Sequence, residues 1–264
     1  MKKFAFVIPV LIFLGFMAVT NKMVASGTFN PLIMVAIFGG AMIVMALIRP
    51  KNKQKAKPVS EIEAKVRGDF AKDAFADDAQ LNAKFQSALK DYSGNMPKSA
   101  LGKLQKLAPL CRNDPEKYAV AIATAQVQLT LGKFFDAARQ YTTALVIHPT
   151  PDLAMEQGGC YQRMGELDRA RSSYTYALDL DENNLEAHSA IATTYVADRE
   201  YEEALGVALK VLEKNEKHPN ALATTAICYG LLNDPIMSRR YADLAEENGY
   251  SRKKITDTIN ALKK

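Results

Sequence analysis

The sequence predicts an all-α chain in which two N-terminal transmembrane helices precede an α-solenoid of helical hairpins. Two observations predict this organisation. Residues 4–20 and 31–48 are two apolar runs without a charged residue, and small and aromatic residues recur at steps of 33, 34 and 34 positions between residues 118 and 250. A fixed period near 34 residues with paired helical patterns is typical of stacked helical hairpins.

The two apolar runs predict a membrane anchor over residues 1–48. They contain 17 and 18 residues, at the lower end of what crosses a bilayer. The first run also fits a signal peptide, because two lysines precede it and the small residues Ala25, Ser26 and Gly27 follow it. We favour two spans over a cleaved signal followed by one span.

The distribution of basic residues predicts the orientation of the anchor. Lys2 and Lys3 flank one end, Arg49 and four lysines flank the other, and Lys22 alone lies between the runs. Because basic residues stay on the cytoplasmic side, both ends are expected to be cytoplasmic. The expected location is the cell (inner) membrane, multi-pass, with the repeats in the cytoplasm. The signal-peptide alternative leaves that side unchanged.

Residues 49–60 form a basic linker between the anchor and the rest of the chain. Its lysines could contact anionic lipid headgroups, or they could act only as a topology signal. The run from Ser60 to Glu63 predicts a capping box that starts a helix. Apolar residues then recur every four positions on one helical face, at Ile62, Val66, Phe70 and Ala74.

Residues 61–117 predict a helical N-terminal cap that includes a degenerate repeat. Residues 79–92 and 98–110 show helical apolar spacing, and a Gly-Asn-Met-Pro turn separates them. Terminal repeats are atypical because one of their faces meets solvent. At the other end, residues 251–264 predict a C-terminal capping helix in which Ile255, Ile259 and Leu262 face the last hairpin.

Four repeats are predicted over residues 118–250. Small residues mark the positions where paired helices cross, since helices approach closely only where side chains are small. These positions are Ala137, Ala170, Ala204 and Ser238 in the second helices, and Ala125, Gly158, Ala192 and Ala226 in the first helices. Gly132 and Gly165 suit a left-handed turn between helices, and Arg199 and Asn233 replace them in the later repeats.

The segments Leu131–Ala138 and Met164–Ala170 carry the turn and second-helix start by which this region resembles the tetratricopeptide repeat family. The resemblance implies a binding scaffold whose first helices line a concave face that receives a protein or peptide. On this sequence the implied contact residues are Ile122, Gln126, Leu129, Asp152, Met155, Glu156, Gln162, Arg163, Glu186, Ser189, Thr193, Asn220 and Ile227.

The same resemblance also sets limits on the ligand. One branch of the family grips a terminal carboxylate with basic side chains and asparagines, but here those positions are largely apolar, neutral or acidic. The acids and apolar residues of the expected face instead favour a segment that combines basic residues with apolar anchors. The membrane anchor is similar to bacterial inner-membrane proteins of this family, and the cysteine-rich metal module of one such group is missing from this sequence.

Charge and reactive residues give no support for nucleic-acid binding or catalysis. Eight of the 34 basic residues precede Glu61 and no acid does, so the remainder holds 26 basic and 29 acidic residues. The basic character therefore belongs to the N-terminal end, and nucleic-acid binding by the repeats is not expected. The three cysteines fit no zinc spacing, and His148, His188 and His218 are expected to be structural. We expect no catalytic residue, metal site or cofactor.

Two functions fit these predictions. The favoured one is a membrane-anchored scaffold or adaptor that binds a partner protein or peptide at the cytoplasmic face of the membrane. The alternative is a structural subunit of a membrane complex that is held mainly through its transmembrane helices.

Overall fold

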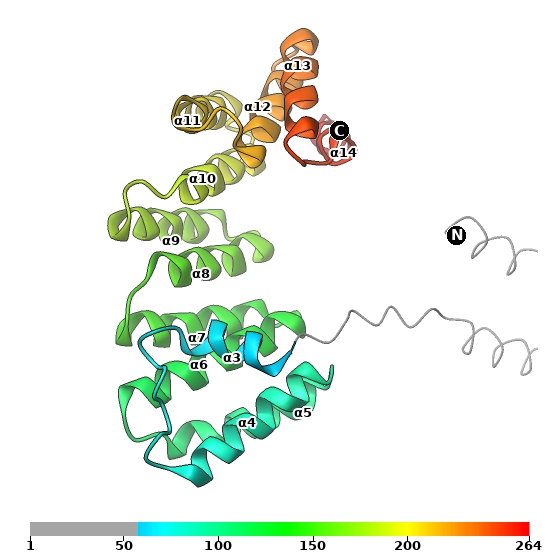
Figure 1. Ribbon diagram of the computed structural model, residues 1–264. Helices are drawn as coiled ribbons and strands as arrows, with labels where there is room; N and C mark the ends of the chain where they lie inside the picture. Colours follow the sequence, from blue (N-terminus) through cyan, green and yellow to red (C-terminus); the bar gives the residue numbers. More distant parts are fainter. Residues whose placement is uncertain (1–57, 264) are drawn as a thin grey trace, which may run out of the picture. The chain divides into compact units, whose positions relative to one another are not determined.

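The computed structural model describes residues 58–263, and it is entirely helical over that range (Figure 1). The two predicted membrane spans, the signal-peptide alternative and nearly all of the predicted basic linker lie outside the described residues. Within residues 58–263, no helix combines the length and the apolar character needed to cross a membrane.

Four helical hairpins follow one another through the region in which the 34-residue period predicts repeats (Figure 1). In each hairpin a first helix packs against a second, and each second helix also packs against the next first helix. The pairs are α6 (Asp114–Thr130) with α7 (Phe134–Ile147), α8 (Pro151–Met164) with α9 (Leu167–Leu180), α10 (Leu185–Ala197) with α11 (Tyr201–Lys214), and α12 (Pro219–Leu231) with α13 (Pro235–Glu247). The predicted all-α solenoid is confirmed.

The small residues of the repeat lie in the helix crossings. Ala137, Ala170 and Ala204 are fully buried, and Ser238 is 9% exposed and donates a hydrogen bond to the Ala226 carbonyl at 2.8 Å. Gly158 lies so close to the Tyr174 ring that a Cβ at this position would be 2.4 Å from Cε1. The spacing predicted from the sequence is therefore a steric requirement of the packed hairpins.

Each turn within a hairpin contains one residue in the left-handed region. Gly132 and Gly165 have φ values of 71° and 77°, as the sequence predicts, and Arg199 and Asn233 have values of 67° and 64°. The later repeats thus keep the turn geometry without glycine. A left-handed backbone is unfavourable for arginine, so this turn carries local strain.

A further hairpin precedes the repeats. It pairs α4 (Ala79–Ser93) with α5 (Pro97–Leu107), followed by the short 3₁₀ helix η1 (Ala108–Leu110). Leu101, Leu104 and Leu107 are buried as their spacing predicts. Leu110 is not, because the chain has left the α-helix before reaching it, and 43% of it is exposed.

The helix α3 (Val59–Arg67) differs from its sequence prediction at both ends. It starts inside the segment assigned to the linker, its N-cap is Pro58 and no side chain caps it, so the predicted capping box at Ser60 is wrong. It ends at Gly68, which has φ 52°. Ile62 and Val66 are buried on its inner face, but Phe70 and Ala74 lie in the turn that follows and do not extend that face as helix.

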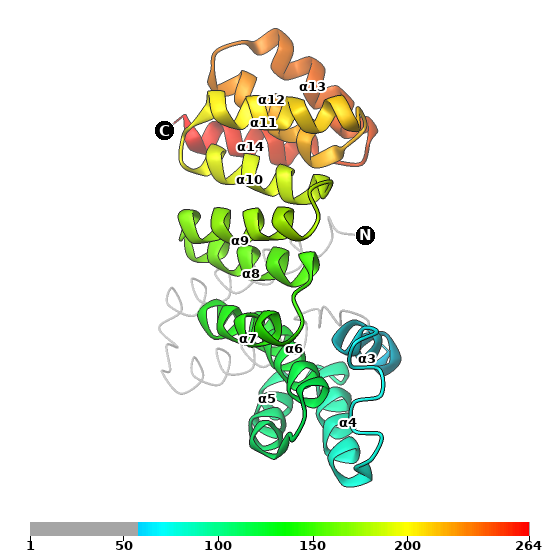
Figure 2. The same cartoon turned by 90° about the vertical axis from the view of Figure 1, so that its left-hand side faces the viewer.

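Arg67 fixes this turn against the cap hairpin. Its guanidinium donates hydrogen bonds to the carbonyls of Lys72 and Ala74 at 3.0 and 2.9 Å, and to Asn82 Oδ1 at 3.0 Å. It also lies 5.4 Å from the centroid of the Phe85 ring. Seen from the side, α3 lies next to α6 and close to α4 (Figure 2), and it packs against both.

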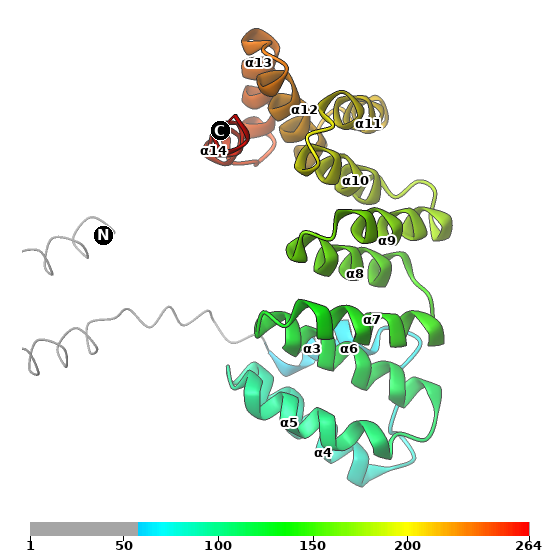
Figure 3. The same cartoon turned by 180° about the vertical axis from the view of Figure 1, so that it is seen from behind.

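At the other end, α14 (Arg252–Leu262) packs against α12 and α13 (Figure 3). Ile255 is buried, while Ile259 and Leu262 are half-buried. His218 lies in the turn between α11 and α12. It is the buried N-cap of α12, where its Nδ1 accepts a hydrogen bond from the Ala221 amide at 3.3 Å.

The buried apolar residues of the described region form two separate clusters. One runs from α3 to the start of α10, and the other runs from the end of α10 to α14. Between the clusters, Arg171 on α9 joins that helix to α10: its guanidinium pairs with Asp198, the C-cap of α10, and lies 5.2 Å from the centroid of the Tyr195 ring. It also pairs with Asp168 of its own helix.

Candidate functional site

A groove of ≈ 690 Å³ lies between α3 and its following turn on one side and the first helices α6 and α8 on the other. Its lining residues come from the cap and from the first two repeats. They are Lys65, Gly68, Asp69, Phe70, Tyr118, Ile122, Gln126, Tyr141, His148, Thr150, Asp152, Leu153, Met155, Glu156, Gly159 and Arg163. The groove therefore exists only because α3 adds a third wall to the repeat surface.

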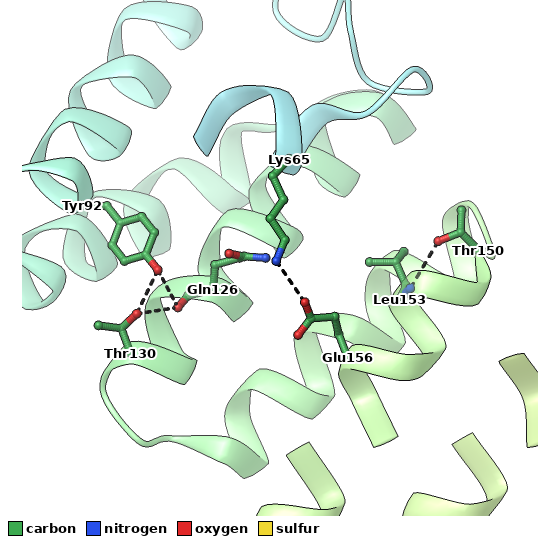
Figure 4. Close-up of polar contacts among 7 residues, drawn as sticks. All are labelled: Lys65, Tyr92, Gln126, Thr130, Thr150, Leu153 and Glu156. Atoms are coloured by element: carbon green, nitrogen blue, oxygen red, sulfur yellow. Dashed lines mark hydrogen bonds and ion pairs between the residues drawn. The ribbon is translucent and has the colours of Figure 1, made fainter. Parts of the chain in front are cut away.

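One ion pair spans the groove. Lys65 Nζ on α3 lies 3.0 Å from Glu156 Oε1 on α8 (Figure 4). Both side chains are partly exposed, so the pair stabilises the fold by at most about 1 kcal/mol. Behind it, the Tyr92 hydroxyl donates a hydrogen bond to the Gln126 carbonyl at 3.2 Å and lies 2.9 Å from Thr130 Oγ1. The cap hairpin is thereby joined to the first repeat.

Three rings gather at one end of the groove. Phe70 stacks on His148 with ring centroids 4.4 Å apart, and it meets Tyr118 edge to face at 5.1 Å. Asp152 follows in the first turn of α8, where the helix dipole favours a carboxylate. Burial, and after it the negative charge of Asp152, raises the pKa of the Tyr118 hydroxyl. This end is aromatic and acidic.

The other end is closed by Arg163, whose guanidinium lies 5.7 Å from the centroid of the Phe134 ring. Between the two ends, Met155 supplies an apolar wall, and Gly159 leaves the surface of α8 open because only the tip of Arg163 lies near it. Tyr141 is completely buried and lines the same groove. Its hydroxyl has no hydrogen-bond partner among the described residues.

The groove brings together about half of the residues predicted to bind a peptide. Ile122, Gln126, Asp152, Met155, Glu156 and Arg163 all line it. Ile122 is only 3% exposed, since α3 packs over α6, and it forms the floor. Because α3 covers part of α6, the predicted concave face is narrower at the N-terminal end of the repeats than it would be without α3.

The remaining predicted residues lie outside this groove and hold neighbouring first helices together. Gln162 Nε2 donates to Thr193 Oγ1 at 3.4 Å, and Asn220 Nδ2 donates to Glu186 Oε2 at 3.2 Å. Ser189 and Ile227 are 1% and 7% exposed, and their predicted contact with a ligand stays a prediction. Leu129 is partly buried against the core.

Sequence reasoning missed the residues that α3 and the turns contribute, chiefly Lys65, Asp69, Phe70 and His148, and it missed Tyr118 in the first turns of α6. The apolar spacing predicts Phe70 on a helix face, although Gly68, two residues earlier, indicates that the helix stops. Nothing in the repeat pattern predicts that the cap folds back beside α6. That position is decided by tertiary packing of Val66 and Arg67.

The described residues contain no group of three or more histidine, cysteine or acidic side chains placed to hold a metal ion. Cys160 and Cys228 are buried free thiols, and Cys111 is half-buried. Burial raises the pKa of Cys160 to about 11 and that of Cys228 to about 12, so both are protonated near neutral pH.

Comparison with known proteins identifies the type of repeat. Residues 161–229 match the family model described as tetratricopeptide repeat. A segment of 95 residues is 27% identical to the Protein CTR9 homolog of Arabidopsis thaliana; it covers 35% of this chain but only 8% of that protein's length.

Solved structures show the same fold. A tetratricopeptide repeat protein from Parabacteroides merdae superposes with a TM-score of 0.60 at 21% identity, over 69% of this chain and 72% of that one. YrrB, described as a TPR protein with an unusual peptide-binding site, gives a TM-score of 0.53 at 19% identity, over 72% of this chain and 98% of its own. Residues 161–229 therefore match tetratricopeptide repeats, and the described residues fold as an all-α solenoid like those of these structures.

Proposed function

We propose that the chain is a membrane-anchored scaffold that holds a segment of a partner protein in the groove between α3, α6 and α8. The observation that supports this most directly is the groove itself, with its apolar wall, charged rim and unpaired buried hydroxyl. Tetratricopeptide solenoids present such faces to extended or helical peptides. The proposed role is binding, without catalysis.

The membrane part of the proposal rests on sequence alone. Two uncharged apolar runs precede the described residues, and their flanking lysines favour a cytoplasmic position for both ends. Reporters fused after Lys57 and after Lys264 should both be active in the cytoplasm. A reporter active only outside the cytoplasm at either position would refute the topology, whereas a mature chain that begins near Gly27 would replace two spans by one.

Capture of partners by the detergent-solubilised full chain tests the groove. We expect Asp152→Lys to weaken capture most at low salt, because charge attraction at a partly exposed rim is screened by ions. Met155→Ala should weaken it by roughly fivefold at any salt concentration, since it removes an apolar anchor. Among the acids, only Asp152 is replaced. Replacing Glu156 by lysine as well would remove the ion pair with Lys65 and put two ammonium groups opposite each other.

The control is Asp179→Asn, on the exposed side of α9 and away from the groove. Captured proteins are identified by mass spectrometry for each variant. Unchanged capture by both groove variants at low salt would mean that the groove is not the binding site. Capture that instead depends on residues 1–48 would favour the structural-subunit alternative.

A further inference from the structure

We propose that the Tyr118 end of the groove binds the guanidinium group of an arginine side chain in the captured segment. The inference rests on the proposed function, namely that the groove holds part of a partner protein. It adds which residue of the segment is bound at this end of the groove and which side chains bind it.

The charges at this end are not balanced. Lys65 and Glu156 neutralise each other across the groove, and Arg163 lies at the opposite end over the Phe134 ring. The carboxylates of Asp69 and Asp152 line the groove, and neither has an ion-pair or hydrogen-bond partner in the part of the chain that the structure describes. Two unneutralised carboxylates that line the same groove from opposite sides attract a cation.

The rings beside these carboxylates favour arginine among the cations that a protein segment can supply. Phe70, Tyr118 and His148 form one cluster with centroid distances of 4.4 to 5.9 Å, and Phe70 keeps 36% of its surface exposed. A planar guanidinium can stack on an exposed ring while its edge donates paired hydrogen bonds to a carboxylate. An ammonium group cannot do both with the same geometry.

A second feature of the groove also fits a polar ligand. The Tyr141 side chain is fully buried and lines the groove, yet its hydroxyl lacks a hydrogen-bond partner among residues 58–263. Buried hydroxyl groups are nearly always paired, and an exception calls for a missing partner. A peptide carbonyl of the bound segment would supply the acceptor to this hydroxyl on α7.

The probe is a set of fluorescently labelled peptides that contain leucine. Each peptide has a single arginine, and its position differs from one peptide to the next. Binding to the full chain in nanodiscs is measured by anisotropy. We expect at least one peptide to bind, and citrulline in place of its arginine to weaken binding about tenfold or more, because a charge-assisted hydrogen bond is lost. Asp69→Asn and Asp152→Asn should each weaken the binding of the arginine peptide and leave the binding of the citrulline peptide unchanged.

Two further variants complete the design. Asp179→Asn is the matched carboxylate-to-amide control and should leave binding unchanged. Phe70→Leu keeps an apolar side chain but removes the ring, so it should reduce the preference for arginine over lysine. Thermal unfolding followed by circular dichroism verifies that every variant keeps its fold.

The outcomes separate this inference from the proposed function. Equal binding of the arginine and citrulline peptides would overturn the arginine site, as would an equal loss in the Asp179 control. If no peptide of the scan binds while Met155→Ala still reduces partner capture, the arginine site is wrong and the groove function stands. If Met155→Ala also leaves capture unchanged, the groove function fails with it.

Discussion

At the scale of single residues, two neighbouring glycines in α8 have opposite constraints. A Cβ on Gly158 would lie 2.4 Å from the Tyr174 ring, whereas a Cβ on Gly159 would meet only Arg163 Nη1, at 3.7 Å. The first glycine is required by the helix crossing. The second only lowers the helix propensity of α8.

We therefore predict opposite effects on the free energy of unfolding. Gly158→Ala forces the Tyr174 ring to move and should destabilise the protein by roughly 1–3 kcal/mol. Gly159→Ala adds a methyl group in open space within a helix and should stabilise it by about 0.5–1 kcal/mol. Urea unfolding of the two variants measures both values. A stabilising Gly158→Ala would contradict the crossing geometry.

The Tyr174 hydroxyl shows how a crossing residue also serves the inter-repeat contact. It donates a hydrogen bond to Gln162 Oε1 at 2.8 Å, and Gln162 in turn donates to Thr193 on the next first helix. Burial raises the pKa of Tyr174 to about 12. The hydroxyl therefore remains a donor throughout the ordinary pH range.

At the scale of the elements, the turns between paired helices contain residues in a strained, left-handed conformation. Arg199 occupies a left-handed conformation that Gly165 occupies in the preceding repeat. Such a conformation costs about 1–2 kcal/mol with a side chain present. The backbone bonds that close each turn nevertheless persist, with the Glu166 and Glu200 amides donating to the carbonyls of Tyr161 and Tyr195.

Replacing Arg199 by glycine and Gly165 by arginine should change the free energy of unfolding in opposite directions. Arg199→Gly is expected to raise the free energy of unfolding by up to about 1 kcal/mol, and Gly165→Arg to lower it by about 1–2 kcal/mol. Both sites are exposed, so packing changes do not interfere. Equal melting temperatures for the wild type and both variants would show that the turns are unstrained.

The elements also show what sequence reasoning can and cannot predict here. The repeats follow from spacing, because a side chain such as Ala170 or Ala204 must fit a fixed crossing. The start of α3 does not, because Pro58 and the packing of Val66 decide it instead of the local capping signal at Ser60. The sequence predicts only part of the groove for the same reason. The walls formed by α6 and α8 follow from the 34-residue repeat, whereas the wall formed by α3 does not.

At the scale of the whole described region, the two apolar clusters predict two units of unfolding. Each contains one buried thiol, Cys160 in the first and Cys228 in the second. Their raised pKa values keep both thiols protonated, and therefore unreactive, while they are buried. A thiol reagent then labels each only after local opening.

We predict that Cys228 becomes reactive at a lower urea concentration than Cys160, since its cluster is smaller. The experiment uses Cys111→Ser to remove the half-buried third thiol, and mass spectrometry follows the labelling. Arg171→Ala, which removes the polar contacts between α9 and α10, should widen the difference. Coincident labelling of both thiols in both backgrounds would mean that the solenoid unfolds as one cooperative unit.

If the proposed membrane anchor tethers the chain at its N-terminal end, the third wall of the groove has a mechanical consequence. Tension between the tether and a ligand held against α3, α6 and α8 would pass through the cap and the first two repeats only. The later repeats, with their own apolar cluster, would carry no load. They could remain folded and open to a second contact while the first half is stretched.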